Sequence, residues 1–154
     1  MVSQGDPVPD VKLVGLEGQP VSPADFRGQK LVVYFYPKDD TSGCTREAQD
    51  FTALAREFEK EGTWVLGVSK DAPARHRKFI DKYDLKVALA SDEDGKGCEA
   101  FGTWVEKSLY GRKYMGIERA TFLVDRAGTI HRVWRKVKVP GHAQQVLEAA
   151  KELP

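Results

Sequence analysis

The chain has 154 residues, of which 41% are hydrophobic and 31% charged, and its formal net charge is +1. Its length predicts one domain, residues 1–154, large enough to bury about 70% of the surface of the unfolded chain. The near-neutral charge gives no reason to expect nucleic acid or an anionic membrane as a partner, and no apolar run approaches the roughly 20 residues that span a bilayer. The N-terminal residues lack the basic and apolar regions of a signal peptide, so we expect a cytoplasmic location.

The first half of the chain alternates predicted strands and helices. A buried-looking run at residues 31–36 is typical of a strand, and residues 64–68 form a second such run. One helix is expected to begin near Cys44, and another follows the second strand. Apolar spacings of three and four give each helix one buried face, formed by Ala48, Phe51, Ala55 and Phe58 in the first and by His76, Phe79, Ile80 and Tyr83 in the second.

The second half continues this alternation. Residues 87–90 predict a short strand, and residues 91–101 predict a short helix that carries Cys98 and begins at the polar residues 91–94. Residues 120–124 and 129–134 predict a β-hairpin. The last helix has its apolar face at Ala143, Val146, Leu147 and Ala150. This order of elements predicts an α/β protein, with a mixed central sheet and helices on both faces.

Cys44 and Cys98 are the two cysteines of the chain. They are too few for a disulfide scaffold, and no Cys-x-x-Cys pair or Cys/His cluster predicts a metal, so we expect neither a metal nor another cofactor. In a reducing compartment, chemistry explains a cysteine better than covalent cross-linking does. The histidines have no metal-ligand spacing and are interpreted as structural or surface residues: His76, His131 and His142.

Cys44 lies shortly after the first predicted strand, at the start of a helical pattern. A helix N-terminus presents unpaired N–H groups and about half a positive charge, and both favour a thiolate. The Thr41 hydroxyl is placed to hydrogen-bond that thiolate or a bound oxygen, and Pro37 removes a backbone donor and fixes the turn that leaves the strand. The position therefore predicts a reactive thiol, with a small buried apolar residue as the alternative.

Residues 37–45 read Pro-Lys-Asp-Asp-Thr-Ser-Gly-Cys-Thr, which resembles the Pro-x-x-x-Thr-x-x-Cys motif of the peroxiredoxins. The residues that follow, 46–48, are similar to those of the bacterioferritin-comigratory (PrxQ-type) branch. The similarity extends from residues 5–10 through 26–30 to 116–123 and 134–142. The resemblance implies a thioredoxin fold with an N-terminal hairpin around residues 11–21. It also implies a thiol-dependent peroxidase for hydrogen peroxide and small organic hydroperoxides, recycled by an external thiol such as thioredoxin.

The same resemblance assigns roles to individual residues. Cys44 is the expected nucleophile and forms a sulfenic acid, while Thr41 and Arg119 activate the peroxide and Pro37 shapes and shields the pocket. Without the family, Arg119 would be interpreted as a solvated charge at the end of a strand. Its match to the arginine of the family's Gly-Ile-x-Arg segment favours the functional role. Glu47 matches a carboxylate common in this branch and is a candidate to support the site.

Cys98 fits neither of the branch's usual resolving positions. Many relatives carry a resolving cysteine five residues after the nucleophile, where this chain has Gln49, and others carry it in the next helix, where residues 79 and 80 are apolar. Three roles remain for Cys98: a structural residue, an unusual resolving thiol, or an intermolecular partner. We favour a role outside resolution, because a disulfide needs Cα atoms within roughly 7 Å.

A second class of function keeps the fold and the same cysteine. The chain could be a redox-responsive binding or chaperone module, because loss of the usual resolving cysteine suits slow recycling. Disulfide exchange on protein substrates is disfavoured, since a Cys-x-x-Cys pair is absent from the sequence. The sequence shows no long exposed apolar helix that demands a partner, and we expect a monomer.

Overall fold

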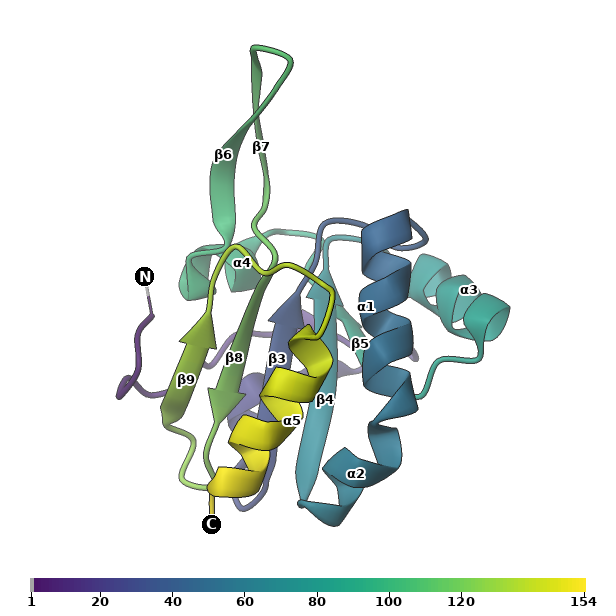
Figure 1. Ribbon diagram of the computed structural model, residues 1–154. Helices are drawn as coiled ribbons and strands as arrows, with labels where there is room; N and C mark the ends of the chain where they lie inside the picture. Colours follow the sequence, from purple (N-terminus) through teal and green to yellow (C-terminus); the bar gives the residue numbers. More distant parts are fainter. Residues whose placement is uncertain (1) are drawn as a thin grey trace.

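A seven-stranded mixed sheet forms the centre of the molecule in this computed structural model, which describes residues 2–154 (Figure 1). The strands lie in the order β2-β1-β5-β4-β3-β8-β9. β3, β4 and β5 run parallel, whereas β8, β9 and the β1–β2 hairpin add antiparallel strands at the two edges. The bounds are β1 Leu13–Val14, β2 Pro20–Val21, β3 Lys30–Phe35, β4 Thr63–Ser69, β5 Ala88–Ser91, β8 Ala120–Val124 and β9 Ile130–Trp134. The predicted α/β class and N-terminal hairpin are confirmed.

Helices cover both faces of this sheet, as parallel strands require. They are the 3₁₀ helix η1 Pro23–Phe26, α1 Ser42–Ala53, α2 Ala55–Lys60, α3 Pro73–Tyr83, α4 Lys96–Phe101 and α5 His142–Glu152. α1, α2 and α5 pack on the face toward the viewer in Figure 1, and α4 packs on the far face. Within residues 2–154, no helix is both long enough and apolar enough to cross a membrane.

β3 divides the interior into two cores, because alternate residues of a strand point to opposite faces. Val32 and Tyr34 belong to the core beneath α1 and α5, which also contains Cys44; we call it the α1-side core. Leu31, Val33 and Phe35 belong to the other core, which contains Cys98 in α4; we call it the α4-side core. All six residues of β3 are buried, which explains the continuous apolar run in the sequence.

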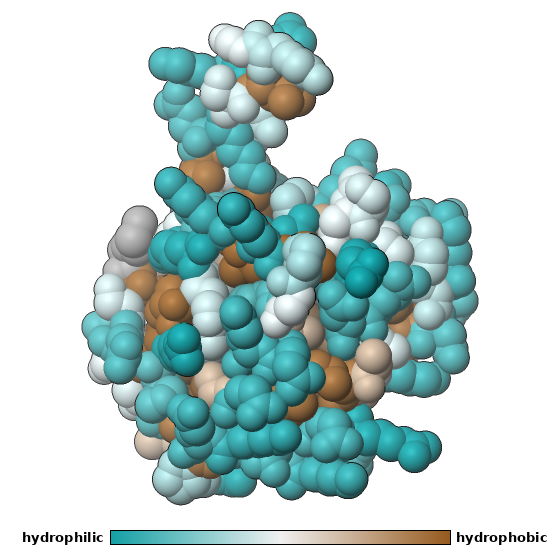
Figure 2. Space-filling view, viewed as in Figure 1, coloured by the Kyte–Doolittle hydropathy of each residue, from teal (hydrophilic) through white to brown (hydrophobic). Residues whose placement is uncertain are grey.

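A two-stranded hairpin, β6 Trp104–Leu109 and β7 Arg112–Ile117, projects from the sheet and was not predicted (Figure 1). Its strands bury few side chains, so they lack the apolar alternation that identifies a strand in sequence. The two residues of its turn, Tyr110 and Gly111, both have positive φ, as in a tight hairpin turn. Figure 2 shows hydrophobic atoms near its tip, and Leu109, which pairs with Arg112 beside the turn, is exposed.

Two predicted helices differ in extent from the observed ones. The helix that carries Cys44 was expected to continue through Phe58, but α1 ends at Ala53 and α2 begins at Ala55. The break occurs at Leu54, whose N–H bonds to carbonyls three and two residues back rather than four. Phe58 nevertheless reaches the α1-side core. The helix expected within residues 91–101 spans only Lys96–Phe101 and is preceded by the polar residues assigned to its N-terminus.

Candidate active site

Cys44 lies in the first turn of α1, in the α1-side core, and only 1% of the residue is exposed. α1 begins at Ser42, and the first backbone N–H to bond back within the helix is that of Thr45, to the Thr41 carbonyl at 2.8 Å. The N–H groups of Gly43 and Cys44 therefore precede the ladder of the helix and are donors available at its N-terminus. Such donors stabilise negative charge on a sulfur or a bound oxygen.

Arg119 joins the site from the segment between β7 and β8, 75 residues away in sequence. Its Nη2 donates to Cys44 Sγ at 3.4 Å, and its Nη1 donates to Glu47 Oε1 at 2.6 Å. Although burial opposes the charge, Glu47 and Cys44 raise the pKa of Arg119 above its ordinary value. The guanidinium thus holds a fixed positive charge against the sulfur and bridges two turns of α1.

Gly43 leaves space for the Arg119 guanidinium beside the first turn of α1. A Cβ at this position would lie 3.1 Å from Arg119 Nη2, which is closer than nearly all real contacts of a Cβ. A glycine directly before Cys44 therefore allows Arg119 to approach the sulfur across the helix N-terminus. The glycine belongs to the sequence motif around Cys44, but its contact with Arg119 carries no signal in the sequence.

Glu47 is almost fully buried one turn into α1, and its two oxygens differ. Oε1 accepts the bond from Arg119, while Oε2 has no hydrogen-bond partner among the described residues. Burial raises the pKa of Glu47 to about 7, despite the opposing effect of Arg119. Both protonation states of this carboxyl are therefore accessible near neutral pH.

Tyr34 lies beneath the site and was not identified from sequence. Its ring stacks on Phe51 of α1 with a centroid distance of 4.7 Å, and its hydroxyl has no partner among the described residues. Burial, and then the charges of Glu47 and Cys44, raise its pKa well above the ordinary value, so the phenol stays neutral. Gly67 in β4 makes room for it, since a Cβ there would lie 2.7 Å from Tyr34 Cζ.

Thr41 and Pro37 lie on the loop between β3 and α1, and both are exposed. The Thr41 hydroxyl donates to the Lys38 carbonyl at 2.8 Å. Its donor hydrogen is therefore engaged within the loop, while its oxygen retains capacity to accept a hydrogen bond. Pro37 follows the buried Tyr36 and begins the turn that leads to α1.

His142 begins α5 and is buried beside the site. Its Nε2 lies 2.7 Å from the Thr121 hydroxyl, and its ring lies in T-shaped arrangements with the rings of Phe51 and Trp134. Burial, with a smaller contribution from Arg119, lowers the pKa of His142 to about 4, so the ring is neutral at pH 7. It fits the structural role predicted for it.

Cys98 lies in the α4-side core, across the central sheet from Cys44, and is fully buried. Both cysteines are free thiols. Burial, and then the Asp92 carboxylate, raise the pKa of the Cys98 thiol well above its ordinary value. The Asp92 carboxylate also accepts hydrogen bonds from the N–H groups of Gly97 at 2.9 Å and Cys98 at 2.7 Å, consistent with the predicted helix N-terminus.

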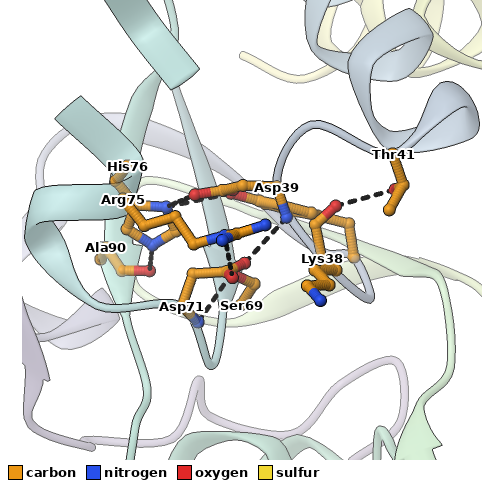
Figure 3. A network of polar contacts seen from close by, with 9 residues as sticks. Lys38, Asp39, Thr41, Ser69, Asp71, Arg75, His76 and Ala90 are labelled. Carbon is orange, nitrogen blue, oxygen red and sulfur yellow. Dashed lines mark hydrogen bonds and ion pairs between the residues drawn. The ribbon is translucent and has the colours of Figure 1, made fainter. Parts of the chain in front are cut away.

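A buried polar network lies behind the Cys44 loop (Figure 3). Asp39, Asp71 and His76 place ligand-type atoms within 4.8 Å of one another, a cluster that sequence spacing did not indicate. Their carboxylate oxygens already accept hydrogen bonds from protein groups, including Tyr36 and Ser69, and the Arg75 guanidinium lies 3.1 Å from Asp71. We interpret the cluster as a hydrogen-bonding network that ties the loop to α3, not as a metal cage.

Comparison with known proteins identifies the family. The model of the AhpC/TSA family matches residues 4–133, and the chain belongs to this family of thiol-dependent peroxidases. Among curated relatives, it is 46% identical over 146 residues to the putative peroxiredoxin Bcp of Coxiella burnetii, which covers 95% of this chain and 97% of the relative. It is 42% identical over 149 residues to peroxiredoxin Bcp of Bacillus subtilis, with coverage of 97% and 95%.

Solved structures refine this placement to one branch. A mutant of PrxQ from Xylella fastidiosa matches with a TM-score of 0.92 at 38% identity, covering 98% of this chain and 96% of that one. The bacterioferritin comigratory protein of Xanthomonas campestris, from a study of alkyl peroxide reduction, matches with a TM-score of 0.87 at 45% identity, covering 92% and 90%. The chain is thus a peroxiredoxin of the Bcp (PrxQ) branch with the thioredoxin fold, and it uses a hydroperoxide and a thiol reductant.

Proposed function

We propose that Cys44 is the nucleophile that reduces hydrogen peroxide and small organic hydroperoxides. The observation that carries this proposal is the Arg119 guanidinium, whose Nη2 lies 3.4 Å from Cys44 Sγ at the N-terminus of α1. A fixed cation and free backbone donors together favour the thiolate and the charge that develops in the transition state. The relative from Xanthomonas campestris, studied for alkyl peroxide reduction, supports organic hydroperoxides as substrates.

In the reaction, the Cys44 thiolate attacks one peroxide oxygen, so that an S–O bond forms while the O–O bond breaks. Sulfur is oxidised by two electrons to a sulfenic acid. The departing oxygen takes up a proton and leaves as water or an alcohol. Arg119 stabilises first the thiolate and then the charge on that oxygen, and Glu47 holds the guanidinium in place.

Thr41 and Pro37 orient the peroxide in this proposal. Because the Thr41 hydroxyl donates to the Lys38 carbonyl, its oxygen is left to accept the O–H of the bound peroxide. The N–H groups of Gly43 and Cys44 supply donors on the other side of the reacting oxygens. Pro37 fixes the turn and shields the pocket. Positioning of this kind accounts for much of the rate in reactions that need an in-line attack.

The sulfenic acid is recycled by an external thiol, with thioredoxin as the donor typical of the family. Cys98 is separated from Cys44 by the central sheet and has a raised thiol pKa, which supports a one-cysteine cycle. The donor thiol displaces water from the sulfenic acid to give a mixed disulfide, and a second donor thiol releases Cys44. A monomer in the cytosol, where such donors are maintained, suits this cycle.

The test is peroxide consumption by Cys44→Ser, with Cys98→Ser as the matched control. We expect Cys44→Ser to abolish turnover with a thiol donor, and Cys98→Ser to retain the rate of the original protein within about twofold. Consumption that survives in Cys44→Ser contradicts the assignment of the nucleophile. Loss of turnover in Cys98→Ser, with an intact fold by circular dichroism, contradicts the one-cysteine cycle.

A further inference from the structure

We infer that His76 is a positioning residue for Cys44: from α3, its Nδ1 holds Asp39 and thereby fixes the loop that delivers the first turn of α1 to Arg119. The inference rests on the proposed role of Cys44 as nucleophile. The hydrogen-bond partners of His76 are Tyr36, Asp39 and Ala90, so His76 acts on the site through the loop between β3 and α1.

Asp39 is the centre of this arrangement (Figure 3). Its carboxylate is fully buried and accepts at both oxygens, at Oδ1 from the Tyr36 hydroxyl at 2.6 Å and at Oδ2 from His76 Nδ1 at 2.6 Å. Its backbone N–H donates to Asp71 Oδ2 at 2.8 Å. The residue is thereby held to three elements at once: the end of β3, the loop after β4, and α3.

His76 is itself fixed from the opposite side. Its ring is fully buried, and Nε2 lies 3.0 Å from the Ala90 carbonyl of β5. The two ring nitrogens thus serve different partners, with Nε2 on the sheet and Nδ1 on the Cys44 loop. A buried hydrogen bond of this length to a carboxyl group is costly to lose, because removing one partner leaves the other buried and unsatisfied.

A second, weaker attachment joins the same loop to the same helix. Asp40 has a φ of +60°, and its carboxylate accepts from Lys82 Nζ at 2.8 Å and from the Tyr83 hydroxyl at 2.6 Å. The hydrogen bonds from Lys82 and Tyr83 lower the pKa of Asp40. Because these groups are solvated, we assign the main constraint to the buried pair of His76 and Asp39.

The loop matters because it ends at the catalytic turn. Thr41 accepts the first helical bond of α1, and the next residues carry the Arg119 contact at Cys44 Sγ. A displacement of about 1 Å in such a site is able to cost a hundredfold in rate. Cys44 is also buried, so we expect a thiol reductant to reach the oxidised sulfur only when this loop moves. A looser loop is expected to slow the peroxide step without slowing re-reduction.

The test uses two substitutions that separate the two nitrogens of His76. The amide nitrogen of His76→Asn lies near the position of Nδ1 and keeps the donor to Asp39, whereas that of His76→Gln lies near Nε2 and keeps the donor to Ala90. We expect His76→Gln to lower the second-order rate constant for oxidation of Cys44 by about tenfold or more, and His76→Asn to stay within about threefold of the original protein. Lys78→Gln, at an exposed position of α3, is the control for the helix.

The rates are measured by stopped-flow fluorescence in single turnovers with excess hydrogen peroxide. Under this condition a partly unfolded sample loses amplitude, but the observed rate constant does not change. Equal rates for His76→Gln and the original protein overturn the inference, as does an equal loss in His76→Asn. Re-reduction of the sulfenic acid by dithiothreitol is expected to be at least as fast in His76→Gln. If re-reduction slows by the same factor as the peroxide step, the substitution has damaged the whole site, and that result also overturns the inference.

Tyr36→Phe provides a second variant if either His76 variant is too unstable to purify. It removes the hydroxyl that donates to Asp39 Oδ1 and lies 3.4 Å from His76 Nδ1, and it keeps the packed ring. A slower peroxide step supports the inference, and an unchanged one overturns it. If peroxide consumption survives in Cys44→Ser, the proposed function itself is wrong. The rates of the His76 and Tyr36 variants test only the positioning role of His76.

Discussion

Cys44 and Cys98 occupy the same position in two helices, and their surroundings are opposite. Each is the third residue of its helix, each follows a glycine, and each is buried. Cys44 faces the Arg119 guanidinium at 3.4 Å, whereas the amide of Cys98 is bound by the Asp92 carboxylate, whose charge raises the thiol pKa. Helix position alone therefore does not set the electrostatic environment of a cysteine.

The length of the helix adds to this difference. α1 has 12 residues, whereas α4 has six, too few for a strong dipole at its N-terminus. The Asp92 carboxylate also accepts hydrogen bonds from the N–H groups of Gly97 and Cys98, which are then not available to stabilise a thiolate. At α1 the corresponding N–H groups of Gly43 and Cys44 precede the first helical bond, and in the proposed reaction they are donors to the peroxide. The neighbouring charge and the free donors distinguish the two thiols.

The most direct way to break the contrast is to remove the cation. We expect Arg119→Leu to lower the second-order rate constant of Cys44 with hydrogen peroxide by about 10²–10³-fold, the usual loss for a donor that stabilises transition-state charge. Arg119→Lys keeps the positive charge but loses the planar guanidinium that contacts both Cys44 and Glu47. Its rate constant should therefore lie between those of Arg119→Leu and the original protein. Stopped-flow kinetics measures both. A rate for Arg119→Leu above a tenth of the original would contradict this role.

Alkylation of the folded protein compares the two thiols in one sample. At pH 7 we expect iodoacetamide to modify Cys44 at least about 100-fold faster than Cys98, because the thiol pKa of Cys98 is raised whereas Cys44 faces the Arg119 guanidinium. Peptide mass mapping over time measures the ratio. Labelling in urea, where both thiols should react alike, is the control. Equal labelling in the folded state would show that the two environments do not differ as described.

The buried carboxyl at the active site gives a smaller effect, on stability. Burial raises the pKa of Glu47 from 4.5 to about 7, so between these values the folded protein holds a proton that the unfolded chain has lost. The free energy of unfolding should therefore fall as pH rises from about 5 to about 8. Glu47→Gln remains neutral and should reduce this fall.

Urea unfolding at pH 5 and pH 8 measures this difference. Glu148→Gln, at an exposed position of α5, is the matched control and should keep the original pH dependence. An identical pH dependence for Glu47→Gln and the original protein would mean that Arg119 fully offsets the burial of Glu47.

The smallest expected change concerns the fit of Arg119 over the helix. In Gly43→Ala, the new Cβ would lie 3.1 Å from Arg119 Nη2 and displace the guanidinium by a few tenths of an ångström. We expect the peroxide rate to fall about three- to tenfold, while the melting temperature is maintained or rises, because alanine is a better helix former than glycine. Stopped-flow kinetics measures the peroxide rate, and thermal unfolding of the same preparation measures the melting temperature. Unchanged kinetics would show that the site tolerates the shift.

The sequence predicted the parts of the fold that bury apolar residues in regular patterns. The runs at residues 31–36, 64–68 and 120–124 became central strands, because a strand covered on both faces requires apolar residues at every position. The β6–β7 hairpin was missed for the converse reason, since its exposed strands carry little apolar pattern. The dipeptide Tyr110-Gly111 was the one local signal that could have identified its turn.

The candidate site was predictable to a different extent. Cys44 and Thr41 share a short motif, but Arg119 could be assigned only through the family resemblance, because its contact with Cys44 spans 75 residues of sequence. Tyr34 and the pair of Asp39 and His76 carried no local signal. Their roles arise from contacts between separate elements, and those contacts exist only once the sheet is assembled.

The most direct test of the contrast between the two cysteines is the intact mass of the protein after one equivalent of hydrogen peroxide, with a sulfenic-acid trap present. We predict a single trap adduct that maps to Cys44, with Cys98 recovered as a free thiol. A loss of two hydrogens without an adduct would reveal a Cys44–Cys98 disulfide. That result would contradict the separation of the two thiols by the central sheet and the one-cysteine cycle built on it.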